Sequence, residues 1–177
     1  HSGSYGGSIE NPALALAHLL ATIRDKKTGK ILVPGFYDGV AALSAVERKA
    51  LHDGPEADKE RYRDFLKVPC LFGERGFSHV EHTTTRPTIE ITGMTSGHHG
   101  ITSNIVPSFA YVRILMRLVP RQKPAAIIAA VRKHLMKHCP KTVTMDIQNG
   151  HGAPPYLFPQ TSDVVSRAER AITRVFG

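Results

Sequence analysis

Apolar residues recur at helical spacing in two segments of this chain, and each segment opens with a helix-start signal. The first follows Asn11-Pro12, where an N-cap residue precedes a proline at the first helical position. The second begins near Lys123-Pro124. Their predicted buried stripes are Leu16, Leu19, Leu20 and Ile23 in the first and Ile127, Ile128, Val131 and Leu135 in the second. Such stripes need an apolar partner surface, so we expect both helices to cover one face of a sheet.

Two further helices are indicated by local signals. Ser44 and Glu47 form a capping-box pattern that opens a charged helical stretch through about Lys67, interrupted at residues 52–55. The other helix begins near Thr161-Ser162 and continues to the last residue. Its apolar stripe consists of Val164, Val165, Ala168, Ala171, Ile172 and Val175.

Three segments alternate apolar and polar residues with the period of a β-strand. They span residues 88–94, 108–118 and 142–148. From residue 88 on, the order is therefore strand, strand, helix, strand, helix. This order predicts an α+β fold in which helices cover one face of an antiparallel sheet. Residues 26–86 are charged and rich in turn residues, and we interpret them as an insertion within a single domain that spans residues 1–177.

Composition excludes several classes of protein. A hydrophobic content of 41% is typical of a globular domain, and no apolar run approaches the length of about 18 residues that a membrane span needs. The first residues lack the basic and apolar regions of a signal peptide. Cys70 and Cys139 are too few for a disulfide framework, so we expect a reducing, cytoplasmic location and no membrane partner.

The net charge of +8 is compatible with a polyanionic partner, but the basic residues are dispersed. They lie around residues 26–30 and along residues 132–141, and no aromatic residues are interleaved with them as in a nucleic-acid-binding patch. We interpret both groups as solvated faces and expect no nucleic-acid partner. A basic nucleic-acid-binding module is the weaker alternative, which salt-dependent binding of a duplex would support.

Polar side chains flank the second predicted strand in two short motifs. Asn104 lies in the turn Ser103-Asn104-Ile105-Val106-Pro107 that opens the strand, and Arg117 ends the strand just before Pro120. A guanidinium at the rim of a sheet can bind a carboxylate through two hydrogen bonds, and an asparagine adds a neutral donor and acceptor. Glycine-rich loops at residues 1–7 and at Gly150-His151-Gly152 are typical of a small-molecule site.

Metal binding by this chain itself is not expected. The histidine pairs are His79-x-x-His82, which lies beside Glu81, and His98-His99. A structural zinc site takes about four ligands and a catalytic one about three, and no third cluster at ligand spacing accompanies these pairs.

Seven segments follow one another in the order found in one protein family: HSGSYGGSIENPALAL, GKILVPGFYDGV, RPTIEITGM, SNIVP, RLVPRQ, NGHGAPP and ERAITRVFG. In these segments the chain resembles the lid, or dimerisation, domain of the M20 family of di-zinc aminoacylases and peptidases, and in particular its carnosine-dipeptidase-like branch. The resemblance implies a ferredoxin-like βαββαβ sandwich whose first strand precedes His1. The chain is therefore expected to be an excised lid domain that lacks this strand.

The resemblance also implies roles for four residues. His1 would reach into the active site of the partner subunit and stabilise the oxyanion there. Asn104 would hydrogen-bond the substrate, also across the dimer. Arg117 would bind the carboxylate of the substrate, and His151 would contact the substrate near that carboxylate. Residues 96–100 depart from the pattern of relatives, which leaves the substrate class open.

The resemblance assigns two Zn²⁺ ions to a catalytic domain that is missing from this chain. We therefore expect no cofactor in the fragment and no catalysis by the fragment alone. The parent would be a cytoplasmic hydrolase that cleaves an amide bond in a dipeptide or an N-acyl amino acid, and its lid would pair as a homodimer. The alternative is a stand-alone dimerisation module of a non-catalytic protein.

Overall fold

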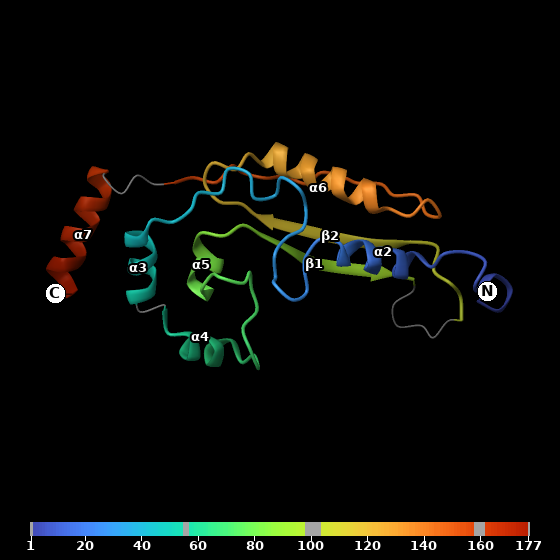
Figure 1. Cartoon of the computed structure of the whole chain (residues 1–177), viewed down its shortest axis with the longest axis horizontal. Coiled ribbons are helices and arrows are strands. Elements are labelled where there is room, and N and C mark those ends of the chain that lie inside the picture. Colours follow the sequence, from blue (N-terminus) through green and yellow to red (C-terminus); the bar gives the residue numbers. More distant parts are fainter. Residues whose placement is uncertain (1, 55–56, 98–103, 158–161, 177) are drawn as a thin grey trace.

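The structure, a computed structural model, describes residues 2–54, 57–97, 104–157 and 162–176. In chain order its elements are α1 (Ser2–Tyr5), α2 (Pro12–Ala21), α3 (Ala45–Asp53), α4 (Lys59–Leu66), α5 (His79–Thr84), β1 (Thr88–Ser96), β2 (Ala110–Arg117), α6 (Pro124–His138) and α7 (Asp163–Phe176) (Figure 1). The predicted helix starts at Asn11, Ser44 and Lys123 are confirmed as the N-caps of α2, α3 and α6. No helix within the described ranges is long and apolar enough to cross a membrane.

β1 and β2 form an antiparallel hairpin in which Thr88 lies opposite Arg117 and Ser96 lies opposite Ala110. A bulge shifts the register between Ile91 and Gly93. Because successive side chains of a strand point to opposite faces, this pairing gives the sheet two chemically different faces. The inner face carries Ile89, Ile91, Ile114 and Met116, and the outer face near the end of β2 carries Thr88, Glu90, Leu115 and Arg117.

α2 and α6 both pack against the inner face of the hairpin, as predicted (Figure 1). The core cluster consists of Leu19, Ile23, Ile31, Val33, Phe36, Ile89, Ile127, Val131 and Leu135. Phe36 is fully buried in it. The α+β fold class is therefore confirmed, and the arrangement is consistent with a ferredoxin-like lid domain.

The segment at residues 26–86 is divided between the core and the surface. Ile31, Val33 and Phe36 are among the most buried residues, so the first part of the segment is integral to the core. α3, α4 and α5 follow as a peripheral unit, and neither α3 nor α4 contains a buried residue. The interpretation of the whole segment as an insertion stays a prediction.

The predicted strand at residues 142–148 is wrong. Its alternation is present, since Val143, Met145 and Ile147 are half-buried and the last two pack on the core. No described strand pairs with it, however, and its link to α6 is a hydrogen bond from the Arg132 side chain to the Ile147 carbonyl (3.0 Å). A β-strand is defined by the backbone hydrogen bonds that it forms with a neighbouring strand. A periodic pattern in one segment does not reveal whether such a neighbour is present.

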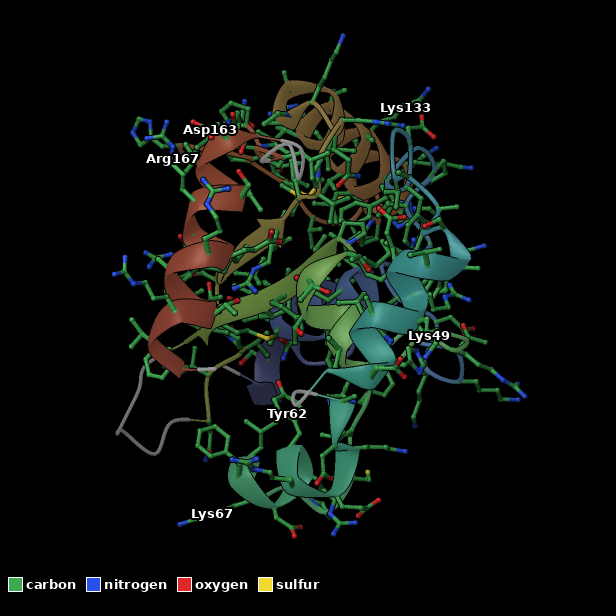
Figure 2. The ribbon with its side chains drawn as sticks, turned by 90° about the vertical axis from the view of Figure 1, so that its left-hand side faces the viewer. Lys49, Tyr62, Lys67, Lys133, Asp163 and Arg167 are labelled. Carbon is green, nitrogen blue, oxygen red and sulfur yellow. The ribbon has the colours of Figure 1, made fainter. Side chains whose placement is uncertain are left out.

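α7 confirms the predicted C-terminal helix, but its apolar stripe is exposed. Val164, Ile172, Val175 and Phe176 are each at least 60% exposed. Asp163 and Arg167 form an ion pair (2.6 Å) on the side of α7 that points away from the rest of the molecule (Figure 2). The stripe of α7 therefore does not contribute to the described core.

His134 connects α6 to α2 inside the core. The imidazole is 6% exposed, and its Nε2 lies 2.9 Å from the hydroxyl oxygen of Thr22. The ring centroid of His138 lies 4.2 Å from that of His134. Burial lowers the pKa of His134, and the charges of His138 and Lys137 act in the same direction, whereas hydrogen bonding at Thr22 opposes them.

We predict that His134 makes the domain less stable as the pH falls below about 6.5. With its lowered pKa, the folded imidazole takes up a proton less readily than the unfolded one, whose pKa is about 6.5. The free energy of unfolding is therefore unaffected by this group above about pH 6.5, decreases as the pH falls from there to the folded pKa, and levels off below the folded pKa. Urea denaturation between about pH 5 and 8 should show a smaller decrease for His134→Gln than for the wild type. His18→Gln is the control for the removal of an exposed imidazole from α2. Parallel pH profiles for the wild type and His134→Gln would contradict this prediction.

Candidate functional site

The two motif residues of the hairpin lie at opposite ends of β2. Asn104 is exposed in the segment at residues 104–109 that precedes β2, and this segment lies at the end of the sheet near α1 (Figure 1). Arg117 is the last residue of β2. Eight residues of a β-strand span about 24 Å from the first to the last. The structure therefore does not bring Asn104 and Arg117 into one site within a single chain.

The structure does not place either of the two predicted histidines, His1 and His151, beside Asn104 or Arg117. His151 is exposed in the extended segment that follows α6, between Gly150 and Gly152. His1 lies outside the described residues, as does the pair His98-His99. The roles of His1 and His151 stay predictions.

Arg117 lines a cavity of about 320 Å³ at its end of the sheet. The cavity lies between the turn after α2, residues 72–74, α5 and the start of β1. The side chains that matter for its chemistry are Arg24, Tyr37, Glu74, His82, Arg86 and Glu90. A larger hollow of about 530 Å³ beside α7 is lined by residues of that helix alone, so it lacks a second wall and is not a candidate site.

Acidic and basic side chains in the cavity are paired, with one exception. Arg86 donates to both carboxylate oxygens of Glu74 (2.8 and 2.9 Å). Arg24 donates to Glu90 (2.9 Å). The Arg117 side chain has no ion pair with any described residue, and it is exposed. The cavity therefore carries an excess positive charge, and that charge is located at Arg117.

The Arg86 guanidinium fixes one wall of the cavity. It lies over the rings of Phe77 (4.1 Å) and Tyr37 (4.9 Å), and the Arg86 side chain is only 14% exposed. The Tyr37 hydroxyl in turn accepts a hydrogen bond from the backbone N–H of Ile31 (2.9 Å). Burial raises the pKa of Tyr37, so the phenol stays neutral at physiological pH and adds no charge beside Arg117.

Two glycines allow the wall to close tightly. Gly29 has a φ of +69°, and a Cβ on this residue would collide with the Gly73 carbonyl. A Cβ on Gly73 would overlap the imidazole ring of His82. The Nε2 atom of that ring lies 2.9 Å from the Glu74 carbonyl oxygen, so the ring is fixed in place.

This arrangement can bind an anion. An unpaired guanidinium in a concave site matches a carboxylate, because its planar N–H groups can donate two parallel hydrogen bonds. A metal site is not formed by the described part of the chain, in which no three His, Cys, Asp or Glu side chains are grouped as ligands. His79, the other histidine of the His79-x-x-His82 pair, stacks on the ring of Tyr62 with the ring centroids 4.8 Å apart.

Sequence patterns identified Arg117 but missed the residues that surround it. Arg24 and Glu90 are 66 positions apart in the chain, and Glu74 and Arg86 are 12 positions apart. No periodicity or motif links such positions. A signal existed only for Glu90, whose place on the polar side of the predicted strand at 88–94 already indicated its face of the sheet.

Comparison with known proteins gives a consistent result. A family model described as a peptidase dimerisation domain matches residues 1–143. The Beta-Ala-His dipeptidase of Rattus norvegicus is 28% identical over 181 residues, which cover 100% of this chain and 36% of the relative. The Cys-Gly metallodipeptidase dug1 of Schizosaccharomyces pombe is 25% identical over 138 residues, which cover 77% of this chain and 29% of the relative. The chain thus spans about a third of the length of the curated relatives that it matches.

Two solved structures share the fold over the whole chain. An M20 family metallo-carboxypeptidase, Sso-CP2 from Sulfolobus solfataricus, is 28% identical with a TM-score of 0.79, covering 100% of this chain and 45% of its own. Human carnosine dipeptidase 1 is 28% identical with a TM-score of 0.81, covering 99% of this chain and 38% of its own. In both cases the similarity is to part of a larger protein.

We predict that Gly73→Ala destabilises the domain by about 1–3 kcal/mol, because the added methyl group overlaps the His82 ring and forces packed groups apart. Urea denaturation measures the change in the free energy of unfolding. Gly152→Ala is the control, since Gly152 has open space around its Cα, and it should change stability by less than about 0.5 kcal/mol. Wild-type stability of Gly73→Ala would mean that His82 is not held against this glycine.

Proposed function

This chain belongs to the M20 peptidase dimerisation domain family, and we propose that it is the lid of a zinc-dependent hydrolase that cleaves an amide bond in a dipeptide or an N-acyl amino acid. The proposal rests on one observation: the excess positive charge of the cavity at the end of β2 is located on Arg117. Dipeptides and N-acyl amino acids share a free carboxylate beside the amide that is cleaved. Arg117 would bind this carboxylate and so position the amide.

The separation of Asn104 from Arg117 supports a role for two subunits. A dipeptide in extended form is only about 7 Å long, so it cannot contact two residues that are separated by the length of β2. In our proposal Arg117 binds the substrate of its own subunit, whereas Asn104 and His1 serve the active site of the partner. His1 precedes α1 in the sequence, and α1 lies at the same end of the sheet as the segment at residues 104–109, which contains Asn104 (Figure 1). A homodimer is therefore part of the proposed function, and it agrees with membership of a dimerisation domain family.

The zinc ions of the proposed hydrolase are not assigned to this chain. The relatives include proteins named as a metallodipeptidase and a metallo-carboxypeptidase. The described residues do not fit a metal, since they contain no group of three candidate ligands. When bound, zinc would activate water and polarise the amide carbonyl, and its ligands would come from the catalytic domain. The contribution of this chain is to bind the carboxylate, exclude water when the lid closes, and donate to the oxyanion through His1.

His151 and the cellular location complete the proposal. His151 is exposed between two glycines, and in our proposal its imidazole contacts the substrate near the carboxylate that Arg117 binds. Cys70 and Cys139 are free thiols, which supports a reducing, cytoplasmic environment.

The first test concerns Arg117. In the full-length hydrolase, Arg117→Gln should raise KM about 10- to 100-fold with a smaller change in kcat. The substitution removes charged hydrogen bonds to the substrate carboxylate, and these stabilise the bound substrate and the transition state equally. Steady-state kinetics on a dipeptide measure both constants. Arg113→Gln is the matched control, because Arg113 lies on the same face of β2, four residues before Arg117, and its substitution should leave KM within about twofold. An unchanged KM in Arg117→Gln would remove the carboxylate-binding role.

The second test concerns the exchange of residues between subunits. A dimer of Asn104→Ala subunits and a dimer of Arg117→Gln subunits should each be impaired. In the mixed dimer, one active site receives both substitutions and the other receives neither, so about half of the wild-type activity per mixed dimer should return. Mixed dimers are isolated with two different affinity tags. Subunits that carry both substitutions in one chain serve as the control. Mixed with either single variant, they form no intact active site, so the activity of the mixed dimer should not exceed that of the single variant alone. No recovery in the mixed dimer would show that the Asn104 and Arg117 that serve one active site come from the same subunit.

A further inference from the structure

Glu90 is the acidic residue nearest to Arg117 on the outer face of the hairpin. Thr88 lies directly opposite Arg117, and Glu90 follows two positions along β1, opposite Leu115. Glu90 and Arg117 are therefore diagonal neighbours on one face. Diagonal pairs of this kind have Cα atoms about 7–8 Å apart, which two long side chains can bridge. The Glu90 carboxylate could therefore form an ion pair with the Arg117 guanidinium and so compete with a ligand for it.

Arg24 holds the Glu90 carboxylate instead. The Arg24 Nη2 atom donates to Glu90 Oε1 (2.9 Å) and to the Ile89 carbonyl oxygen (2.5 Å). The Arg24 guanidinium also lies over the ring of Phe72 at 5.9 Å, and its backbone forms a bridge with Ile31. The Arg24 side chain is 28% exposed and the Glu90 side chain 53% exposed. The carboxylate is therefore bound on the side of β1 where Arg24 is fixed, and Arg117 is left without an acidic partner among the described residues.

We propose that Arg24 is a positioning residue that holds the carboxylate of Glu90 away from Arg117, and so keeps the Arg117 guanidinium available for the carboxylate of a ligand. This inference rests on the proposed function of Arg117. It explains why the charges in the cavity are paired as they are. Arg86 neutralises Glu74 and Arg24 neutralises Glu90, so Arg117 remains available for the ligand.

The magnitude follows from the exposure of the groups. A pair between half-exposed side chains forms with an equilibrium constant of about 1.5 to 5. Without Arg24, the pair of Glu90 with Arg117 would therefore raise the apparent dissociation constant of a carboxylate ligand by a factor of about 2 to 6, because only the unpaired fraction of Arg117 can bind. The effect should disappear when Glu90 is neutralised as well.

The direct test uses the chain itself and requires no enzyme activity. Phenylglyoxal modifies arginine guanidinium groups, and pairing with a carboxylate slows the reaction. Under single-hit conditions, peptide mass mapping gives the rate of modification at Arg117 for the wild type, Arg24→Gln, Glu90→Gln and the double variant. We expect Arg117 to react about 2- to 6-fold more slowly in Arg24→Gln and at the wild-type rate in Glu90→Gln and in the double variant.

Each other outcome overturns the proposal. An unchanged rate at Arg117 in Arg24→Gln would mean that Glu90 does not reach it. A slower rate that persists in the double variant would mean that Arg24 acts through the structure and not through Glu90. Protection of Arg113 in place of Arg117 would mean that the released Glu90 pairs with Arg113. If Arg24→Gln does not fold, Arg24→Lys is the second variant: its ammonium keeps the charge, so Arg117 should react at the wild-type rate, and protection there would contradict the proposal.

Kinetics in the full-length hydrolase separate this inference from the proposed function. Arg24→Gln should raise KM about 2- to 6-fold with kcat little changed, and the double variant should restore KM. If Arg117→Gln leaves KM unchanged, the proposed function fails whatever the phenylglyoxal result. If Arg117→Gln raises KM but the double variant does not restore that of Arg24→Gln, the proposed function stands and the role of Arg24 is wrong.

Discussion

The burial of Phe36 is the constraint on which the position of Arg117 depends. Its side chain is completely enclosed in the core, and its backbone carbonyl accepts a hydrogen bond from Nε2 of the buried Gln122 (2.7 Å). The same amide group accepts a hydrogen bond from the backbone N–H of Val119 (3.0 Å), two residues after β2 ends. The turn that buries the largest core side chain therefore also fixes the segment that follows Arg117. Truncating a buried phenylalanine costs about 3–5 kcal/mol, and here the end of the strand would lose its support as well.

Outside this apolar core, α3 is linked to α5 by charge. The carboxylate of Glu81, on α5, is almost completely buried and lies 3.0 Å from Arg48 and 3.7 Å from His52 on α3. Burial alone would raise the pKa of Glu81, but hydrogen bonds from Ser78 together with the charges of Arg48 and His52 outweigh it and hold the pKa below its usual value. The carboxylate therefore stays ionised and keeps α3 against α5. The ion pairs thereby hold α3 against the helix that supplies His82 and Thr83 to the cavity wall.

The parts of the fold that the sequence could predict are those that depend on neighbouring residues. Asn11 and Ser44 were recognised because an N-cap bonds to backbone N–H groups within three residues of itself, and the strand at β1 was recognised because alternation is local. The segment at 142–148 has the same local alternation but no ladder, because pairing depends on a second strand elsewhere. The candidate site divides in the same way. Arg117 is predictable because it lies at the end of a strand. The Arg24–Glu90 pair beside it is not, because its two residues are 66 positions apart in the chain and meet only in the folded domain. The roles assigned to His1, Asn104 and His151 came from the family resemblance and stay predictions.

The extended segment at residues 142–148 is held to the core by side chains and not by a strand ladder with any described residue. Its backbone amides lack a neighbouring strand among the described residues, and it is attached by Arg132 and by half-buried side chains. Segments of this kind exchange their amide hydrogens through local opening at a small free energy, while a packed hairpin and helix exchange only when the whole domain unfolds. Since the chain reaches α7 through this segment, α7 can be released while the core of α2, α6 and the hairpin remains closed. We therefore expect the hairpin, α2 and α6 to unfold as one cooperative unit, and the segment at residues 142–148 to detach before it.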